Sequence, residues 1–229
     1  PNTRYFTDLV EDLPRMSLQM DTFVTGPLQV NTAVLQSAGQ VAVIDPGSMM
    51  PDGFTQFLDD HGLDVTQIWL THGHGDHISG VSLLKQKFPD AMLYCPTADQ
   101  AMLADPTQNL SSWYMVEITA PPADVLLTPG DELTLGDTRW TVLDTAGHTP
   151  GGVSFYCAEE GLVFTGDALF AGSVGKTEIP GGNMPQLIRN IHANLLSLPD
   201  DTRVVPGHMD ETSIARERAT NPFLRRNAP

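Results

Sequence analysis

The sequence has little positive charge and no long apolar run, and each shortage excludes a class of protein. Its 229 residues include only 12 lysines and arginines against 28 aspartates and glutamates, which gives a formal net charge of -16. Binding to nucleic acid depends on clustered basic side chains, so we expect no nucleic-acid partner. No apolar stretch approaches the length needed to cross a bilayer, and the negative charge disfavours an anionic membrane surface. We therefore expect a soluble protein with no membrane partner.

Cysteine is also scarce. Only Cys95 and Cys157 occur, and neither stands beside another cysteine or in a metal-binding pair. The sequence alone leaves a disulfide between them open, but it favours two reduced, buried thiols in a cytoplasmic protein, because each cysteine closes a short apolar run. The chain has the length for one large hydrophobic core, and we predict a single domain over residues 1–229.

Periodicity predicts many short strands mixed with a few helices. Alternating and β-rich segments indicate strands, whereas apolar residues spaced three and four apart indicate helices. The predicted strands are Met16–Thr25, Val30–Ser37, Gln40–Asp45, Gln67–Leu70, Met92–Cys95, Val125–Leu127, Leu133–Leu135, Arg139–Asp144, Val153–Tyr156 and Leu162–Thr165. The predicted helices are one that begins behind Asp52, then Asp76–Lys87, Thr97–Leu103 and Pro185–Leu196.

Residues 105–123 differ from the rest of the chain. They have no clean period and include Pro106, Pro121 and Pro122. We interpret them as a long loop, and loops of this length inside compact domains are usually lids or binding loops. A surface helix around Trp113–Ile118 is an equal alternative.

The segment THGHGDH, residues 71–77, places three imidazoles and a carboxylate within six residues. These are the ligands that borderline divalent cations such as zinc prefer. Four such groups would be a costly way to fill a core, because buried polar groups need partners and buried charges need a counter-charge or a metal. In an extended turn, His72 and His74 point the same way, while Asp76 and His77 begin the next helix and face a neighbouring point. The spacing therefore predicts two metal ions.

The second half of the chain supplies three more candidate ligands, each at the end of a strand and next to a glycine. They are His148, Asp167 and His208. A shared strand–glycine–ligand pattern predicts one common rim, where small residues let the backbone come close to the metals. Five of the seven histidines fall in these motifs, and we assign no site role to His61 and His192.

The motifs THGHGDH, AGHTPGG, TGDALF and PGH, in this order, resemble those of the metallo-β-lactamase superfamily. Within it the chain is similar to the small glyoxalase II-like (hydroxyacylglutathione hydrolase-like) enzymes, which hydrolyse S-acylglutathione thioesters. The resemblance implies an α/β fold, a four-layer αβ/βα sandwich with two sheets face to face and helices outside. It places the metal site along one edge. The implied ligands are His72, His74 and His148 for the first metal, Asp76, His77 and His208 for the second, and Asp167 bridging.

The expected function is hydrolysis of a small-molecule thioester such as S-lactoylglutathione. Two divalent cations, with zinc favoured and iron or manganese as alternatives, make hydroxide from a bound water at neutral pH, and the hydroxide attacks the thioester carbon. Asp76 is the expected catalytic residue, because it can orient the nucleophile as well as bind metal. Lys176 resembles the basic residue that the family places near glutathione, and is the candidate substrate-binding residue. We expect Asp45 and Thr149 to fix the imidazoles.

The main alternative is a persulfide dioxygenase on the same fold, an oxidoreductase that uses one iron held by His72, His148 and Asp167. Intact ligands at both metal positions, and a closing segment more like that of the small hydrolases, favour the hydrolase. A non-catalytic binding module would have lost one or more ligands, and all seven are present. The sequence leaves open the acyl group, the thiol carrier and the oligomeric state.

Overall fold

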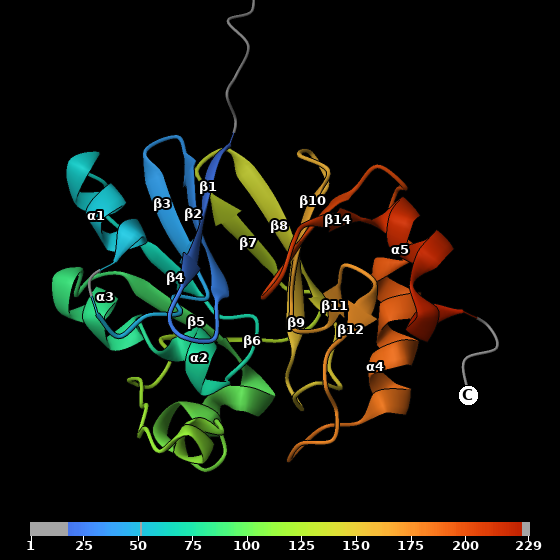
Figure 1. Ribbon diagram of the computed structural model, residues 1–229. Coiled ribbons are helices and arrows are strands. Elements are labelled where there is room, and N and C mark those ends of the chain that lie inside the picture. The colour runs from blue at the N-terminus through green and yellow to red at the C-terminus, as the bar shows by residue number, and fades with distance from the viewer. Residues whose placement is uncertain (1–17, 51, 226–229) are drawn as a thin grey trace, which may run out of the picture.

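Two six-stranded sheets pack face to face in the computed structural model, which describes residues 18–50 and 52–225 (Figure 1). The first sheet has the order β1-β2-β3-β4-β5-β6 and the second β14-β13-β10-β9-β8-β7. The strands of the first sheet are β1 (Gln19–Thr25), β2 (Val30–Ser37), β3 (Gln40–Ile44), β4 (Gln67–Trp69), β5 (Met92–Pro96) and β6 (Val125–Leu127). Those of the second are β7 (Glu132–Leu135), β8 (Thr138–Asp144), β9 (Val153–Cys157), β10 (Leu162–Gly166), β13 (Arg203–Pro206) and β14 (Thr212–Ser213).

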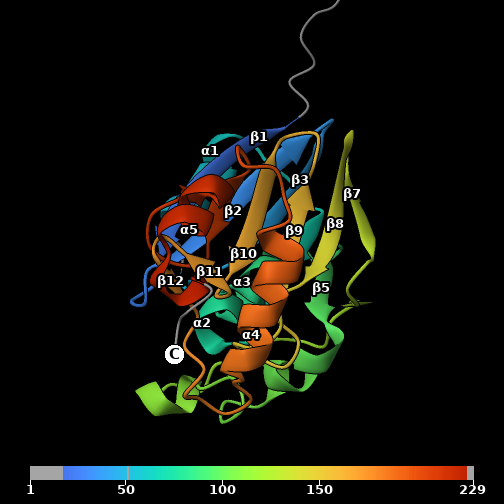
Figure 2. The ribbon, with the colours of Figure 1, turned by 90° about the vertical axis from the view of Figure 1, so that its right-hand side faces the viewer.

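Helices cover the outer face of each sheet (Figures 1 and 2). The first sheet is covered by α1 (Gly53–Asp60), α2 (Gly75–Ile78) and α3 (Val81–Lys87), and the second by α4 (Met184–Asn190), a π-helical turn (Ile191–Leu195) and α5 (Ile214–Thr220). The remaining elements are 3₁₀ helices at Thr97–Ala104, Ser111–Tyr114 and Pro222–Leu224, and a hairpin of β11 (Leu169–Phe170) and β12 (Ser173–Val174).

The alternation of side chains along the strands builds the layers. In β2, Ala33 and Leu35 face the core between the sheets, whereas Val34 faces the helices. At the centre of the inter-sheet core, the rings of Trp69 and Trp140 meet edge to face, with their centroids 5.6 Å apart. The four-layer αβ/βα sandwich expected from the sequence is therefore confirmed.

One predicted helix is interrupted in the structure. The predicted helix Asp76–Lys87 is two helices, α2 and α3, which are separated at Ser79 and Gly80. The backbone N–H of Gly80 donates to the carbonyl of Pro46 at 2.7 Å, and a side chain at Gly80 would collide with backbone oxygens of residues 46 and 48. This tertiary contact breaks the helix.

Other differences are smaller. The predicted helix Pro185–Leu196 ends in the π-helical turn, and Thr97–Leu103 forms a 3₁₀ helix. Residues 105–123 form a loop with one short 3₁₀ turn, so the alternative helix around Trp113–Ile118 is wrong. The first two residues of the predicted opening strand, Met16 and Ser17, lie outside the described residues.

The two cysteines are free and buried in different layers. Cys95 packs under the helices of the first sheet, whereas Cys157 lies between the sheets, so they form no disulfide. Within residues 18–50 and 52–225, no helix is long and apolar enough to cross a membrane.

Candidate metal centre

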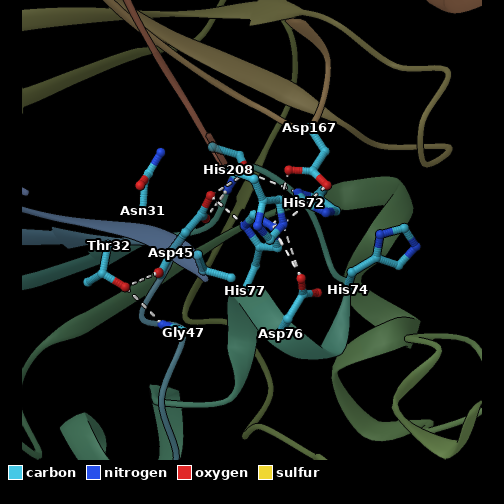
Figure 3. Close-up of polar contacts among 12 residues, drawn as sticks. Asn31, Thr32, Asp45, Gly47, His72, His74, Asp76, His77, Asp167 and His208 are labelled. Carbon is cyan, nitrogen blue, oxygen red and sulfur yellow. Dashed lines mark hydrogen bonds and ion pairs between the residues drawn. The ribbon is translucent and has the colours of Figure 1, made fainter. Parts of the chain in front are cut away.

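The predicted ligands lie in loops and in one short helix that follow strands at one edge of the sandwich. His72 and His74 follow β4, and α2 carries Asp76 and His77 directly after them. His148 lies in the turn between β8 and β9, Asp167 follows β10, and His208 follows β13. Figure 3 shows Asp167 and His208 entering from the second sheet and meeting Asp76 and His77 from α2. The structure thus brings together residues from both sheets, as the shared strand–glycine–ligand pattern predicted.

The first group consists of His72, His74 and His148, whose candidate ligand atoms lie within 4.8 Å of one another. Nε2 of His148 is 2.9 Å from Nδ1 of His74. Nε2 of His72 and Nε2 of His74 are buried and have no hydrogen-bond partner among the described residues. A buried polar atom without a partner is costly, and a cation satisfies an imidazole nitrogen in this state. The group therefore fits a metal ion.

The second group consists of Asp76, His77 and His208. Nε2 of His208 lies 3.2 Å from Nε2 of His77 and 3.2 Å from Oδ2 of Asp76. Asp167 reaches both groups: its Oδ1 is 3.3 Å from Nε2 of His77, and its Oδ2 is 3.5 Å from Nε2 of His148. A carboxylate between two ligand groups is placed to serve both.

The second nitrogen of four imidazoles lies against a nearby oxygen, which fixes the orientation of each ring. Nδ1 of His77 lies 2.9 Å from Oδ2 of Asp45, which is the contact expected for Asp45. The other three pairs are His72 Nδ1 with Thr71 Oγ1 at 3.0 Å, His148 Nδ1 with the Lys176 carbonyl at 2.7 Å, and His208 Nδ1 with the Gln29 carbonyl at 3.2 Å. Thr149 does not contact an imidazole in this way; its hydroxyl donates to Asp99.

Asp99 was missed by the sequence analysis. It is fully buried, and its carboxylate accepts from Gly73 N at 3.0 Å, Gly151 N at 2.7 Å and Thr149 Oγ1 at 2.7 Å. It therefore ties the loop of His72 and His74 to the loop of His148. Its partners lie 26 or more positions away in the sequence, so no local pattern marks it.

In the first group, burial favours the neutral form of His72 and His74. It lowers the pKa of His74 to about 3, with the neighbouring His148 adding to the effect. It also lowers the pKa of His72 well below its usual value, together with the charges of the other imidazoles. Neutral imidazole is the form that binds metal, so these side chains are ready to act as ligands at neutral pH.

In the second group, neighbouring charges favour the protonated form of an imidazole. Burial opposes the charged form of His77, but the carboxylates of Asp76, Asp167 and Asp45 outweigh it and raise the pKa of His77 well above its usual value. Burial likewise opposes ionisation of Asp167, yet the charge and hydrogen bond of His77 hold the pKa of Asp167 well below its usual value. A cation at this group would take over the role of the His77 proton.

Both groups open into a cleft of about 940 Å³. Five of the predicted ligands line it: His74, Asp76, His148, Asp167 and His208. Lys176, the predicted substrate-binding residue, also lines the cleft, and it makes no ion pair within the described part of the chain. His61 and His192 belong to none of the metal-binding groups found among these residues.

Known proteins resemble the chain over most of its length. The profile of the Metallo-beta-lactamase superfamily matches residues 25–208. The probable metallo-hydrolase YqgX of Bacillus subtilis (strain 168) is 39% identical over 87% of this chain and 94% of its own length. The hydroxyacylglutathione hydrolase GloC of Haemophilus influenzae is 33% identical over 80% of this chain and 86% of its own.

Solved structures also resemble the chain over most of its length. The BLEG-1 B3 metallo-β-lactamase has a TM-score of 0.85 and 37% identity, over 90% of this chain and 99% of its own. TTHA1623 in a di-iron-bound form has a TM-score of 0.80 and 35% identity, over 89% of this chain and 100% of its own. ETHE1 from Myxococcus xanthus has a TM-score of 0.74 and 28% identity, over 89% of this chain and 83% of its own. The chain belongs to the metallo-β-lactamase superfamily, a group of metal-dependent enzymes.

Proposed function

We propose that the protein is a binuclear metal-dependent hydrolase that cleaves a small-molecule thioester such as S-lactoylglutathione. The observation that carries the proposal is the pair of three-residue ligand groups with Asp167 between them, at the wall of a cleft of about 940 Å³. The 33% identity to a hydroxyacylglutathione hydrolase supports the choice of substrate.

In this proposal His72, His74 and His148 hold one cation, and Asp76, His77 and His208 hold the other. Asp167 serves both. Zinc is the favoured metal, with iron or manganese as alternatives, and one relative was solved in a di-iron-bound form. Two divalent cations supply Lewis acidity, which acidifies a water and polarises a carbonyl oxygen.

Asp76 is the proposed catalytic residue. It lines the cleft, and although burial opposes its ionisation, the charge of His77 and the hydrogen bond from His208 lower its pKa. An ionised carboxylate at this position can orient a water and accept its proton. Lys176, exposed along the same cleft, would neutralise an anionic group of the thiol carrier.

The alternative, a persulfide dioxygenase with a single iron, has support in the 28% identity to ETHE1 from Myxococcus xanthus. A single metal at His72, His148 and Asp167 would leave the second group without a purpose. That group is complete, and the pairing of His77 with Asp45 orients its central ring. The hydrolase is therefore the better explanation of the site.

The test is to measure metal content and turnover in one preparation, following both thioester loss and oxygen uptake. We expect ~2 metals per chain and loss of S-lactoylglutathione without oxygen uptake. His208→Ala should retain ~1 metal and lose most of the turnover, while His192→Ala, a change at an exposed histidine outside the site, should match the unmodified protein. One iron per chain with oxygen consumed on glutathione persulfide would instead establish the dioxygenase.

A further inference from the structure

We propose that this site prefers thioesters with a bulky apolar acyl group over those with a small polar one such as lactoyl, and that the apolar group binds against two apolar walls of the cleft. The inference rests on the proposed thioester hydrolysis and names the substrate class. One wall consists of Leu28, Met49 and Met50, from the loops that follow β1 and β3, and the other of Trp113, Tyr114 and Val116, from the loop of residues 105–123. In the reaction a water oxygen bonds to the acyl carbon and the carbon–sulfur bond breaks. One proton of the water passes to the leaving thiolate, and the other is released when the carboxylic acid product ionises.

The first observation is where the exposed apolar side chains gather. Twelve large apolar residues are exposed among the described residues, and six of them line this one cleft. Trp113 is 56% exposed and Tyr114 is 60% exposed. Single exposed apolar residues are ordinary, but a group of them around a polar centre is typical of a binding site.

The second observation is that the aromatic wall is held in place. Trp113 and Tyr114 lie on the 3₁₀ turn Ser111–Tyr114, and the residues at its two ends, Leu110 and Met115, have positive φ angles of 66° and 58°. Such angles are unfavourable for these residue types and persist only where surrounding contacts impose them. The backbone strain therefore indicates that the turn is fixed with its aromatic side chains exposed.

Asn109 supplies those contacts. It is buried, and its side-chain amide donates to the carbonyls of Met102 and Ile118 at 2.9 Å each, while its Oδ1 accepts from Ser111 N at 3.0 Å. Its backbone carbonyl accepts from Gly75 N, the first residue of α2, at 2.8 Å. The aromatic wall is thus attached to the helix that carries Asp76 and His77, and a group bound against the wall has a defined position relative to the metal centre.

The third observation concerns charge. Apart from Asp76, Asp167 and the histidines of the metal centre, Lys176 is the one charged residue among the described residues that line the cleft. A substrate recognised mainly through several anionic groups would need more cations than this. The apolar walls instead offer dispersion contacts and removal of apolar surface from water, which favour an alkyl or aromatic acyl group.

The experiment uses two series on one thiol, glutathione, with the metal-loaded protein. The first series consists of S-lactoyl-, S-acetyl-, S-butanoyl-, S-hexanoyl- and S-octanoylglutathione, assayed for kcat/KM. The second consists of S-methyl-, S-butyl- and S-octylglutathione, thioethers that cannot be hydrolysed, whose Kd is measured by calorimetry. We expect kcat/KM to rise and Kd to fall by about fourfold per buried methylene until the walls are filled.

Substitutions in the two walls test whether these residues cause the dependence of kcat/KM on acyl chain length. Trp113→Ala should reduce the octanoyl-to-acetyl ratio of kcat/KM at least tenfold. Met50→Ala, in the other wall, should reduce it by a smaller factor, and Trp113→Phe should restore most of it. Phe223→Ala is the matched control, because Phe223 is an exposed aromatic residue that does not line the cleft. Its ratio should be unchanged.

If all the thioesters are hydrolysed but neither kcat/KM nor Kd depends on chain length, the apolar acyl site is wrong. The proposed hydrolase function would then still hold. The absence of hydrolysis for every thioester would overturn the proposed function. In that case the Kd series still decides whether the walls bind an apolar chain.

Discussion

Asp45 and His77 form a buried pair, with Oδ2 of the carboxylate 2.9 Å from Nδ1 of the imidazole. The same carboxylate accepts from the backbone and the hydroxyl of Thr71, at 2.8 and 2.6 Å. Asp45 therefore fixes the ring of His77 and the first residue of the loop that carries His72. One carboxylate outside the proposed ligand set thus contacts His77 of the second group directly and is linked to His72 of the first group through the hydroxyl of Thr71.

Replacing Asp45 with Asn should weaken metal binding at the second group. Asparagine tolerates the positive φ of 47° at this position but cannot accept all the bonds that the carboxylate accepts. We expect affinity at the group of Asp76, His77 and His208 to fall about 10–100-fold. Competition against a chelator measures it. Asp137→Asn, a change on an exposed turn, is the control, and equal affinity in the two variants would contradict the role given to Asp45.

The hydroxyl of Thr149 should contribute to stability through Asp99. Thr149→Val keeps the shape of the side chain but removes the donor to a buried carboxylate, which we expect to cost about 1–2 kcal/mol in the free energy of unfolding. Urea unfolding gives the value. Thr149→Ser should recover most of the loss, and a serine variant as unstable as the valine variant would show that the hydrogen bond is unimportant.

The two cysteines should take no part in the reaction. Burial raises the pKa of both the Cys95 and the Cys157 thiol, which disfavours the reactive thiolate. We expect neither to react with a chromogenic disulfide reagent in the native protein, and both to react after unfolding in guanidinium. Cys157→Ala should keep the turnover of the unmodified enzyme, and a large loss of kcat in this variant at unchanged metal content would contradict this.

The proposed ligands could be predicted from sequence because most of them are local features, a His or Asp beside a glycine after a strand, and His77 directly follows Asp76 in the same motif. Gly207 illustrates why that local pattern is informative. A side chain at Gly207 would collide with the carboxylate of Asp167 and the ring of His77, so the glycine is a requirement of the same site. Both ends of β2 were predicted to the residue. Its successive side chains point alternately into the core between the sheets and into the core under the helices, so the whole strand is rich in apolar residues.

What the sequence could not show depends on contacts between distant segments. The break between α2 and α3 comes from Gly80 meeting the loop at Pro46, and the position of Asp99 is set by loops that begin 26 or more residues away. The two-residue strands β11, β12 and β14 are too short to carry a periodic pattern. The 3₁₀ turn with Trp113 is likewise fixed by Asn109 rather than by its own residues.

The two ligand groups should take up metal with different dependence on pH. In the metal-free protein, nearby carboxylates raise the pKa of His77 despite its burial, so a cation at the second group must displace a proton. Burial lowers the pKa of His74 to about 3, so near neutral pH a cation at the first group meets an imidazole that is already neutral. Below the raised pKa of His77, affinity at the second group should fall at least about tenfold per pH unit, because the pKa of His208 in that group is raised as well, while affinity at the first group should fall less steeply.

Variants that keep only one complete ligand group allow the pH dependence of metal affinity to be measured for each group separately. His208→Ala retains the first group and His148→Ala retains the second, so cobalt(II) absorbance titrations from about pH 5 to 8 report each affinity by itself. Calorimetry in two buffers of different ionisation enthalpy should show at least about one proton released per metal at the second group and fewer at the first. Equal slopes in the two variants would mean that the carboxylates around His77 do not hold its proton in the metal-free protein.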